Sequence, residues 1–199
     1  MKTNLWKKIA ALVLTLCMVL TILPAMPLMA NAAEYTEGYN GTPVTPGKIS
    51  ASNYRSFGLT DGNWSRFNGY YGIRTASELY GFADVVNNGN RTASALLLKD
   101  IVINTGKVTE SGSSSGTTYE WIPIGVNRDV SFLGNFEGNG HTISGLYFNE
   151  LERECVGLFG LIGEAVQNNS VKIQNVTLAN SFIRSGEKIG GIVGTVLGY

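Results

Sequence analysis

His141 is the only histidine of the 199-residue chain, and this limits the metal and nucleophile chemistry that the sequence can support. A zinc peptidase of the His-Glu-x-x-His type needs two histidines on one helix face, so that kind of site is excluded. A Ser-His-Asp triad would have to use His141, which directly follows the turn-forming residues Gly138-Asn139-Gly140. Because no strained nucleophile elbow appears in the sequence, we interpret His141 as a turn residue.

A cluster of acidic residues is the second candidate for chemistry. Glu150, Glu152 and Glu154 surround Arg153, a composition that could bind calcium or act on a polysaccharide. A polysaccharide lyase needs acids and a basic group that converge from several strands. These charges instead follow one another along the chain between two predicted strands, so we expect a solvated loop.

Asp61-Gly62-Asn63 begins like a calcium-binding loop but lacks the later acidic ligands, so a plain turn is expected. Cys155 is the only cysteine beyond residue 33, so no intrachain disulfide can form there, and we expect a small buried or half-buried residue. These motifs assign no catalytic residue, no metal ligand and no cofactor, and they leave the ligand-binding residues unknown.

Eight aromatic residues crowd the Gly- and Ser-rich segment 34–72, too many for a free linker. They are Tyr35, Tyr39, Tyr54, Phe57, Trp64, Phe67, Tyr70 and Tyr71. One interpretation is that they cover the first coil of a repeat structure, whose end would otherwise expose apolar surface. The other is that some of them, such as Trp64 or Tyr71, form a stacking platform for sugar rings. We favour the cover.

An internal repeat indicates the fold class. The glycine-flanked apolar pair Gly157–Gly160 recurs at Gly191–Gly194. The apolar pattern of Ile143–Phe148 recurs at Ile173–Leu178, where Asn175 is expected to point inward at a corner. Short β-branched pieces bounded by Gly, Asn and Ser are typical of strands, and repetition with such a period predicts stacked β-repeats. We therefore expect a β-solenoid.

One helix is signalled before the repeats. Thr75-Ala76-Ser77-Glu78 fits a capping box, and apolar residues with helical spacing follow it. Gly89 can provide the left-handed end of this helix. The apolar runs Ala95–Leu98 and Ile101–Ile103 are then the first predicted strands, and Gly106–Thr118 is predicted to be a flexible surface loop.

The N-terminal segment 1–33 has the features of an export signal. Three lysines precede the apolar run Ile9–Leu23, and the small-residue stretch Ala30–Ala33 resembles a signal-peptidase site. The apolar run is too short for a good membrane span. We expect an extracellular or cell-surface chain with no membrane span after the signal is removed.

The charge balance excludes one class of partner. Residues 1–33 carry three of the 15 basic residues and none of the 15 acidic ones, so the remaining chain is mildly acidic. It has no basic stripe or arginine-rich arm that could neutralise phosphates, so nucleic acid is not an expected partner.

Three motifs, in order, resemble bacterial surface proteins with GLUG-type repeats: Trp121–Gly125, Phe136–Leu146 and Val156–Gly160. The predicted helix, followed by Asn87–Asn90 and Leu98–Ile101, also resembles the segment that often precedes those repeats. The resemblance implies an extracellular right-handed β-helix, found in long cell-wall or secreted proteins of Gram-positive bacteria, including adhesin-like chains and some large peptidases. In those proteins the repeats are scaffold, so no catalytic residue carries over.

The sequence therefore predicts a mainly β protein: a right-handed parallel β-helix (β-solenoid) with one N-terminal capping α-helix, preceded by a signal peptide. The expected division is a signal peptide at 1–33, an aromatic and Gly-rich N-terminal segment or cap at 34–72, and the capping helix plus the start of a truncated GLUG-type β-helix at 73–199. The expected function is that of an exported, non-catalytic scaffold or adhesin-like module that presents binding surface to glycans, cell wall, or host or neighbouring-cell proteins. The alternative is a polysaccharide-degrading β-helix enzyme, or the accessory region of a large secreted peptidase.

Overall fold

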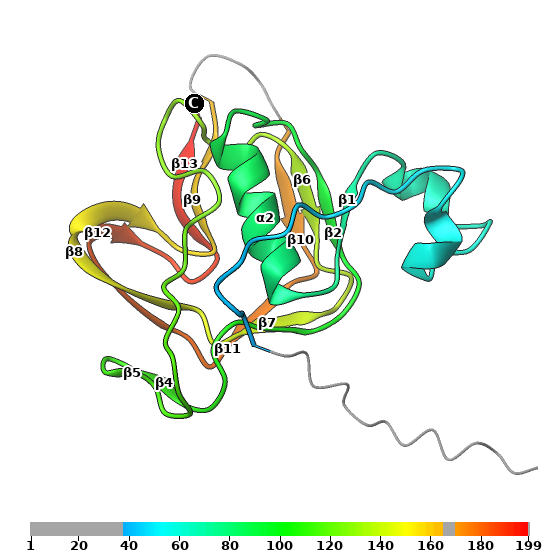
Figure 1. The fold of residues 1–199 in the computed structure, drawn as a ribbon. Coiled ribbons are helices and arrows are strands. Elements are labelled where there is room, and N and C mark those ends of the chain that lie inside the picture. The colour runs from blue at the N-terminus through cyan, green and yellow to red at the C-terminus, as the bar shows by residue number, and fades with distance from the viewer. Residues whose placement is uncertain (1–37, 165–169, 199) are drawn as a thin grey trace, which may run out of the picture. The chain divides into compact units, whose positions relative to one another are not determined.

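The computed structural model describes residues 38–164 and 170–198, which belong to one compact unit spanning Thr36–Tyr199. The described residues form a mainly β structure with one α-helix (Figure 1). The predicted signal peptide lies outside them. Within these residues, no helix combines the length and the hydrophobicity needed to cross a bilayer.

Most strands are short, and β8 and β12 are the longest of those described. The helices are η1 (Tyr54–Phe57), η2 (Trp64–Phe67), both of the 3-10 type, and α2 (Ala76–Asn87). The strands up to the middle of the chain are β1 (Tyr71–Ile73), β2 (Ala95–Leu97), β3 (Ile101–Val102), β4 (Val108–Thr109), β5 (Gly112–Ser113), β6 (Asn135–Glu137) and β7 (Thr142–Ser144). The later strands are β8 (Tyr147–Val156), β9 (Phe159–Gly163), β10 (Lys172–Gln174), β11 (Thr177–Ala179), β12 (Phe182–Ile189) and β13 (Val193–Leu197).

The strands form several small separate sheets. One has four strands in the order β1-β2-β6-β10, one has three in the order β11-β7-β3, and three are pairs: β12-β8, β13-β9 and β4-β5. All neighbours pair in parallel except β4 and β5, which form an antiparallel hairpin. The predicted β-helix is wrong, because these sheets do not close into a solenoid. The mainly β composition and the single helix agree with the prediction for the described residues.

Two features of the chain path keep the sheets separate. After Ile103 the chain leaves to form the β4–β5 hairpin, within the stretch Gly106–Thr118 that was predicted to be a loop. When it returns, Ile124 and Phe132 make isolated bridges to Phe159 and Ile162 of β9 instead of forming a strand. The sheets that contain β8 and β9 therefore stop at two strands, while the sheet that contains β6 reaches four.

The predicted repeat of the glycine-flanked pair is confirmed as a structural equivalence. Phe159 of β9 pairs in parallel with Val193 of β13, so the motifs that begin at Gly157 and Gly191 lie side by side. A Cβ added at Gly157 would lie 2.6 Å from the carbonyl oxygen of Gly190, so the close approach of these two segments requires glycine.

The second predicted repeat has the wrong register. Ile143 pairs with Leu178, and Ile173 pairs with Phe136 of an earlier strand. The connections between strands differ in length, so the offset between partners is not constant along the chain. The prediction rested on the apolar pattern alone, and it therefore matched Ile143 to Ile173, a residue that belongs to another sheet.

The inner face of the four-stranded sheet forms the main core with α2. One register row across this face consists of Tyr71, Ala95, Phe136 and Ile173. The ring of Phe82 lies 5.8 Å from that of Tyr71 and 6.2 Å from that of Phe136, measured between centroids. Figure 1 shows α2 running across these strands. The sheet is thus held from its inner side by the helix.

The outer face of the same sheet changes from apolar to polar along the next row, which runs Gly72, Leu96, Glu137, Gln174. Leu96 is fully buried beneath an apolar cluster that includes Phe57. A Cβ at Gly72 would lie 2.5 Å from the Phe57 ring, so glycine is needed for this ring to pack against β1. The aromatic N-terminal segment therefore covers the outer face of β1 and β2, and the cover gives way to polar residues at β6.

The helix begins as the sequence predicts. Thr75 is the N-cap, and its hydroxyl oxygen accepts a 3.1 Å hydrogen bond from the backbone N–H of Glu78. The Glu78 carboxylate accepts from the backbone N–H of Arg74, one residue before the position that a capping box uses. Gly89 has φ +107°, in agreement with its predicted role at the helix end.

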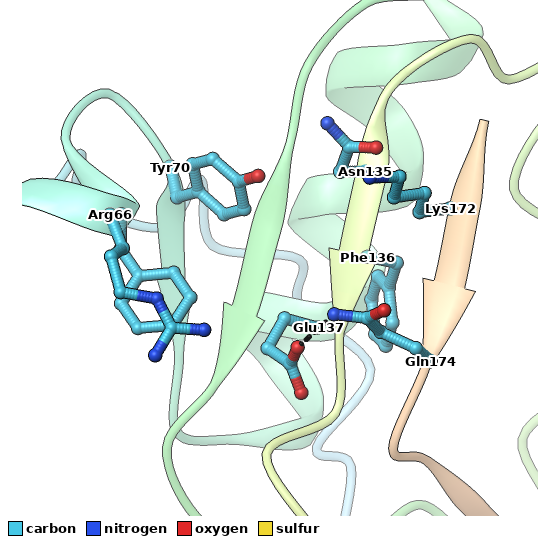
Figure 2. A pocket seen from close by; sticks show the side chains of 8 residues that line it. Arg66, Tyr70, Asn135, Phe136, Glu137, Lys172 and Gln174 are labelled. Carbon is cyan, nitrogen blue, oxygen red and sulfur yellow. Dashed lines mark hydrogen bonds between the residues drawn. The ribbon is translucent and has the colours of Figure 1, made fainter. Parts of the chain in front are cut away.

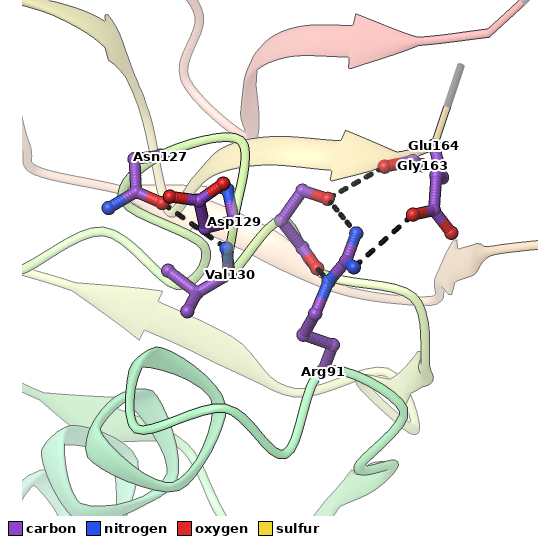
Figure 3. A network of polar contacts seen from close by, with 7 residues as sticks. Arg91, Asn127, Asp129, Val130, Gly163 and Glu164 are labelled. Carbon is purple, nitrogen blue, oxygen red and sulfur yellow. Dashed lines mark hydrogen bonds and ion pairs between the residues drawn. The ribbon is translucent and has the colours of Figure 1, made fainter. Parts of the chain in front are cut away.

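A polar network fixes the loop that leads into β6 (Figure 3). Arg91 donates from Nε to the carbonyl oxygen of Ser131 at 3.1 Å, from Nη2 to its hydroxyl at 2.7 Å, and from Nη1 to Glu164 at 3.3 Å. The Ser131 hydroxyl in turn donates to the carbonyl oxygen of Gly163 at 2.8 Å. The carbonyl and hydroxyl of the buried Ser131 are therefore both satisfied, which gives this network a structural role.

Candidate functional site

A groove opens on the outer face of the four-stranded sheet, next to the end of the N-terminal cover (Figure 2). One wall comes from η2 and the residues after it, and the floor comes from β6 and β10. The lining residues are Arg66, Phe67, Tyr70, Asn135, Phe136, Glu137, Lys172 and Gln174. Its volume of about 160 Å³ is below the roughly 300–1,000 Å³ of pockets that enclose a whole small molecule, so it suits part of an extended ligand.

Strand alternation places polar side chains on the floor of the groove. Phe136 is buried in the core, so its neighbours Asn135 and Glu137 lie on the opposite face of β6. The same alternation in β10 places Lys172 and Gln174 on that face. The parallel register then sets Lys172 beside Asn135 and Gln174 beside Glu137.

Glu137 is the carboxylate of the groove and is 7% exposed. It accepts hydrogen bonds from Gln174 Nε2 at 2.6 Å, from Asn175 Nδ2 at 2.9 Å and from the backbone N–H of Asn139 at 2.7 Å. Burial by itself raises the pKa of Glu137, but these three donors and the charge of Arg66 outweigh it, and the pKa lies below its ordinary value. Glu137 is therefore ionised at neutral pH. Asn175 points outward to it, which corrects the predicted inward orientation.

Asn135 brings an unsatisfied polar atom to the groove. Its Oδ1 is buried and has no hydrogen-bond partner, which is uncommon for a buried polar atom. Figure 2 shows the Asn135 amide close to the Lys172 side chain at one end of the groove.

The opposite wall is aromatic and carries a positive charge. The rings of Phe67 and Tyr70 meet edge to face, with centroids 5.6 Å apart and an interplanar angle of 73°. The guanidinium of Arg66 lies over the Phe67 ring at 5.4 Å from its centroid. Arg66 is exposed, while both rings are half-buried. This wall offers ring faces and a cation to whatever enters the groove.

The combination of groups is typical of a binding site for a polar ring compound. Aromatic side chains present apolar area with little loss of conformational entropy, while amides fix the positions of hydroxyl groups. The carboxylate of Glu137 is fully engaged by protein donors and acts as a fixed part of the floor. The groove therefore offers ring faces, amides and cations to a polar ligand.

His141 occupies the turn that the sequence predicts. Its backbone N–H bonds to the carbonyl oxygen of Gly138 at 2.8 Å. Its Nδ1 lies 3.2 Å from Asp100 Oδ1, which also accepts the backbone N–H of Thr142 at 2.9 Å. Among the described residues no serine hydroxyl bonds to the His141 ring, so no triad is assembled there.

The acidic cluster belongs to β8, so the predicted loop is wrong. Glu150, Glu152 and Glu154 are exposed, as predicted, and Glu154 pairs with Lys188 of β12 at 2.6 Å. These acids are not part of the groove. Across the described ranges, no group of three or more His, Cys, Asp and Glu side chains is arranged to hold a metal ion.

The other predicted candidates also lie outside the groove. Asp61 bonds to the Tyr54 hydroxyl and to Arg55 in an exposed turn. Trp64 stacks on Tyr54 with centroids 5.1 Å apart, and Tyr71 is buried in the core. The two aromatic residues proposed as a sugar platform therefore do not line the site, whereas their neighbours Phe67 and Tyr70 do.

Cys155 is half-buried, as predicted, and its sulfur accepts a 3.2 Å hydrogen bond from the Thr195 hydroxyl.

The motifs in the sequence did not single out any of the polar residues of the groove floor as a site. Alternation around Phe136 and Ile173 was the signal that could have placed Asn135, Glu137 and Gln174 on one outward face.

Comparison with known proteins gives two partial matches. No protein-family model matches the chain, and no solved structure matches it. The chain is 33% identical over 93 residues to halomucin of Haloquadratum walsbyi, a match that covers 47% of this chain and 1% of halomucin. It is 36% identical over 78 residues to a Gly-rich membrane protein of Evansella cellulosilytica, covering 39% of this chain and 8% of that protein. The chain thus spans a small fraction of either relative, and the two matches indicate a location at the cell surface or a membrane.

Proposed function

We propose that this chain is an exported, non-catalytic, adhesin-like module of the cell surface, and that the groove beside Glu137 binds glycans. The observation that carries the proposal is the groove itself. An aromatic wall formed by Phe67 and Tyr70 faces a floor of amides and an ionised carboxylate. Such a site recognises a ring that has both apolar faces and hydroxyl groups.

The proposed location is extracellular, after export through the signal peptide at residues 1–33. The basic start, the apolar run and the small-residue stretch of that segment support export. The resemblance to GLUG-repeat surface proteins and the similarity to halomucin support a place at the surface. Cell wall and proteins of host or neighbouring cells are further proposed partners.

The state of Glu137 supports binding over catalysis. A general acid for glycoside hydrolysis needs a raised pKa and a second carboxylate about 5–10 Å away. Glu137 has a lowered pKa and is held by three donors, and among the described residues no second carboxylate lines the groove. The exposed acids of β8 lie elsewhere in the described structure. The chemistry of the groove thus favours the binding role over the polysaccharide-degrading alternative.

Binding to a panel of immobilised neutral and acidic polysaccharides tests the proposal. Tyr70→Leu keeps apolar bulk but removes the aromatic face, and we expect it to weaken binding roughly three- to tenfold. Trp64→Ala is the matched control, because Trp64 lies in the same segment but outside the groove, and it should leave affinity unchanged. Circular dichroism and urea unfolding establish that both variants are folded.

Two results would contradict the proposal. Binding that is lost on Trp64→Ala and retained on Tyr70→Leu would move the site to the Tyr54–Trp64 stack. If the folded protein bound none of the polysaccharides, the glycan-binding function would be wrong.

A further inference from the structure

The charges around the groove restrict the class of sugar that it can hold. Arg66 stands on the aromatic wall and Lys172 on the opposite side of the floor, and both side chains are exposed. Among the described residues no carboxylate lies within ion-pair distance of either cation. Two positive charges therefore face one negative charge, that of Glu137.

The carboxylate of Glu137 is occupied by protein donors. Oε1 receives hydrogen bonds from Asn175 and from the backbone of Asn139, and Oε2 receives one from Gln174. A ligand therefore meets a carboxylate whose oxygens are already engaged, while the ammonium of Lys172 and the guanidinium of Arg66 retain donors for it. The groove favours a negative group on its occupant.

The side-chain amides of Asn135 and Gln174 add a requirement for hydroxyl groups on the ligand. Asn135 Oδ1 is buried without a partner, and the Oε1 atom of Gln174 is not used in the bond from its Nε2 to Glu137. A sugar hydroxyl both donates and accepts, so it can bond to the amide of the half-buried Asn135 whichever of the two amide atoms faces the groove. A simple inorganic anion would satisfy the cations but would offer no apolar face to Tyr70.

We propose that the groove is specific for an acidic sugar unit, such as a uronic acid within a polysaccharide. The ring stacks on the Phe67–Tyr70 wall, and a hydroxyl group bonds to Asn135. Carboxylates of neighbouring sugar units are bound by Lys172 on one side of the groove and by Arg66 on the other. This inference rests on the proposed glycan-binding function and adds the chemical class of the ligand.

Isothermal titration with two matched probes tests this specificity. The probes are an oligogalacturonate and the neutral oligogalactoside of the same length and linkage, which differ only in a carboxylate against a hydroxymethyl group. We expect the acidic probe to bind more tightly and its affinity to fall as salt is raised. Lys172→Ala and Arg66→Ala should each weaken the acidic probe roughly two- to fivefold, the range for exposed charge pairs, and leave the neutral probe unchanged.

One lysine and one arginine outside the groove provide matched controls for Lys172→Ala and Arg66→Ala. Lys107→Ala and Arg128→Ala remove exposed cations of the same kind elsewhere on the surface, and they should leave both probes unaffected. Equal weakening by all four variants would mean that only the net charge of the chain matters, which overturns a specific site.

The outcomes separate this inference from the function on which it rests. Equal affinity for the acidic and neutral probes, with both weakened by Tyr70→Leu, would overturn acidic specificity and retain glycan binding. If neither these probes nor the polysaccharide panel bound, the proposed function would fail, and the inference with it.

Discussion

Gln174 Nε2 donates a 2.6 Å hydrogen bond to Glu137 Oε2 across the parallel strands β10 and β6. This contact joins the edge strand β10 to β6 within the polar floor of the groove. It also shows how a buried carboxylate is tolerated on the outer face of a sheet. Three donors replace the water that Glu137 loses, and the charge becomes part of the framework.

Glu137→Gln should destabilise the protein by about 1–3 kcal/mol at pH 7. The side-chain amide that replaces the carboxylate must turn a donor toward Asn175, Gln174 or the backbone N–H of Asn139, so at least one hydrogen bond is lost. Urea unfolding followed by circular dichroism measures the change. Glu152→Gln, on the exposed part of β8, is the control and should change stability by less than about 0.5 kcal/mol.

The stability difference between the wild type and Glu137→Gln should depend on pH. Because the pKa of Glu137 is lowered in the folded protein, its stabilising contribution is fully present above the unfolded pKa of about 4.3 and is lost as pH falls through the folded pKa. The stability difference between the wild type and Glu137→Gln should therefore be full at pH 7 and should narrow below about pH 4. A difference that stayed constant down to pH 2 would contradict the lowered pKa.

Gly72→Ala should loosen the cover of the outer face. The added Cβ would lie 2.5 Å from the Phe57 ring and 3.0 Å from Leu98, so the ring must move away from β1. Overpacking of this kind costs about 1–3 kcal/mol, which urea unfolding would detect. In the Phe57→Leu background the same substitution should cost less, because the clashing ring is absent. Additive effects of the two substitutions would show that the ring and the glycine are not coupled.

Arg91→Lys should destabilise the loop that leads into β6, although it keeps the charge. A single ammonium cannot reproduce the bonds that Nε and Nη2 make to the carbonyl and hydroxyl oxygens of Ser131. We expect a loss of about 1–2 kcal/mol, since the ion pair with Glu164 is partly exposed and contributes little of it. Arg128→Lys in the neighbouring loop is the control. If Arg91→Lys were as stable as the wild type, the structural role of this network would be contradicted.

Local signals in the sequence predicted local elements well. The Thr75 cap, the helix that follows it and the strands at Ala95 and Ile101 are all present, because each depends on neighbouring residues. The recurrence of the glycine-flanked pair was also correct, since close backbone approach at Gly157 leaves few alternatives to glycine. These features need no knowledge of distant parts of the chain.

The closed solenoid was wrong and the groove was missed for a shared reason. The register of Ile143 with Leu178 is fixed by the lengths of the connections and by which face is buried, and the hexamer pattern contains neither. Tyr70 and Glu137 line the same groove because the aromatic cover packs over β1 and β2 and gives way to polar residues at β6. The two sides of the groove come from segments that are far apart in the sequence. Neither segment contains a pattern that indicates which distant segment it will lie beside.

Side-chain amide resonances provide the most direct test of the claim that the groove beside Glu137 binds a sugar. In a titration with an oligogalacturonate, followed by nitrogen–proton correlation spectra, the NH₂ groups of Asn135 and Gln174 should shift and saturate together. The NH₂ group of Asn87, which donates to the carbonyl oxygen of Pro123 away from the groove, should stay in place. Saturable shifts elsewhere on the protein, with Asn135 and Gln174 unmoved, would contradict the account.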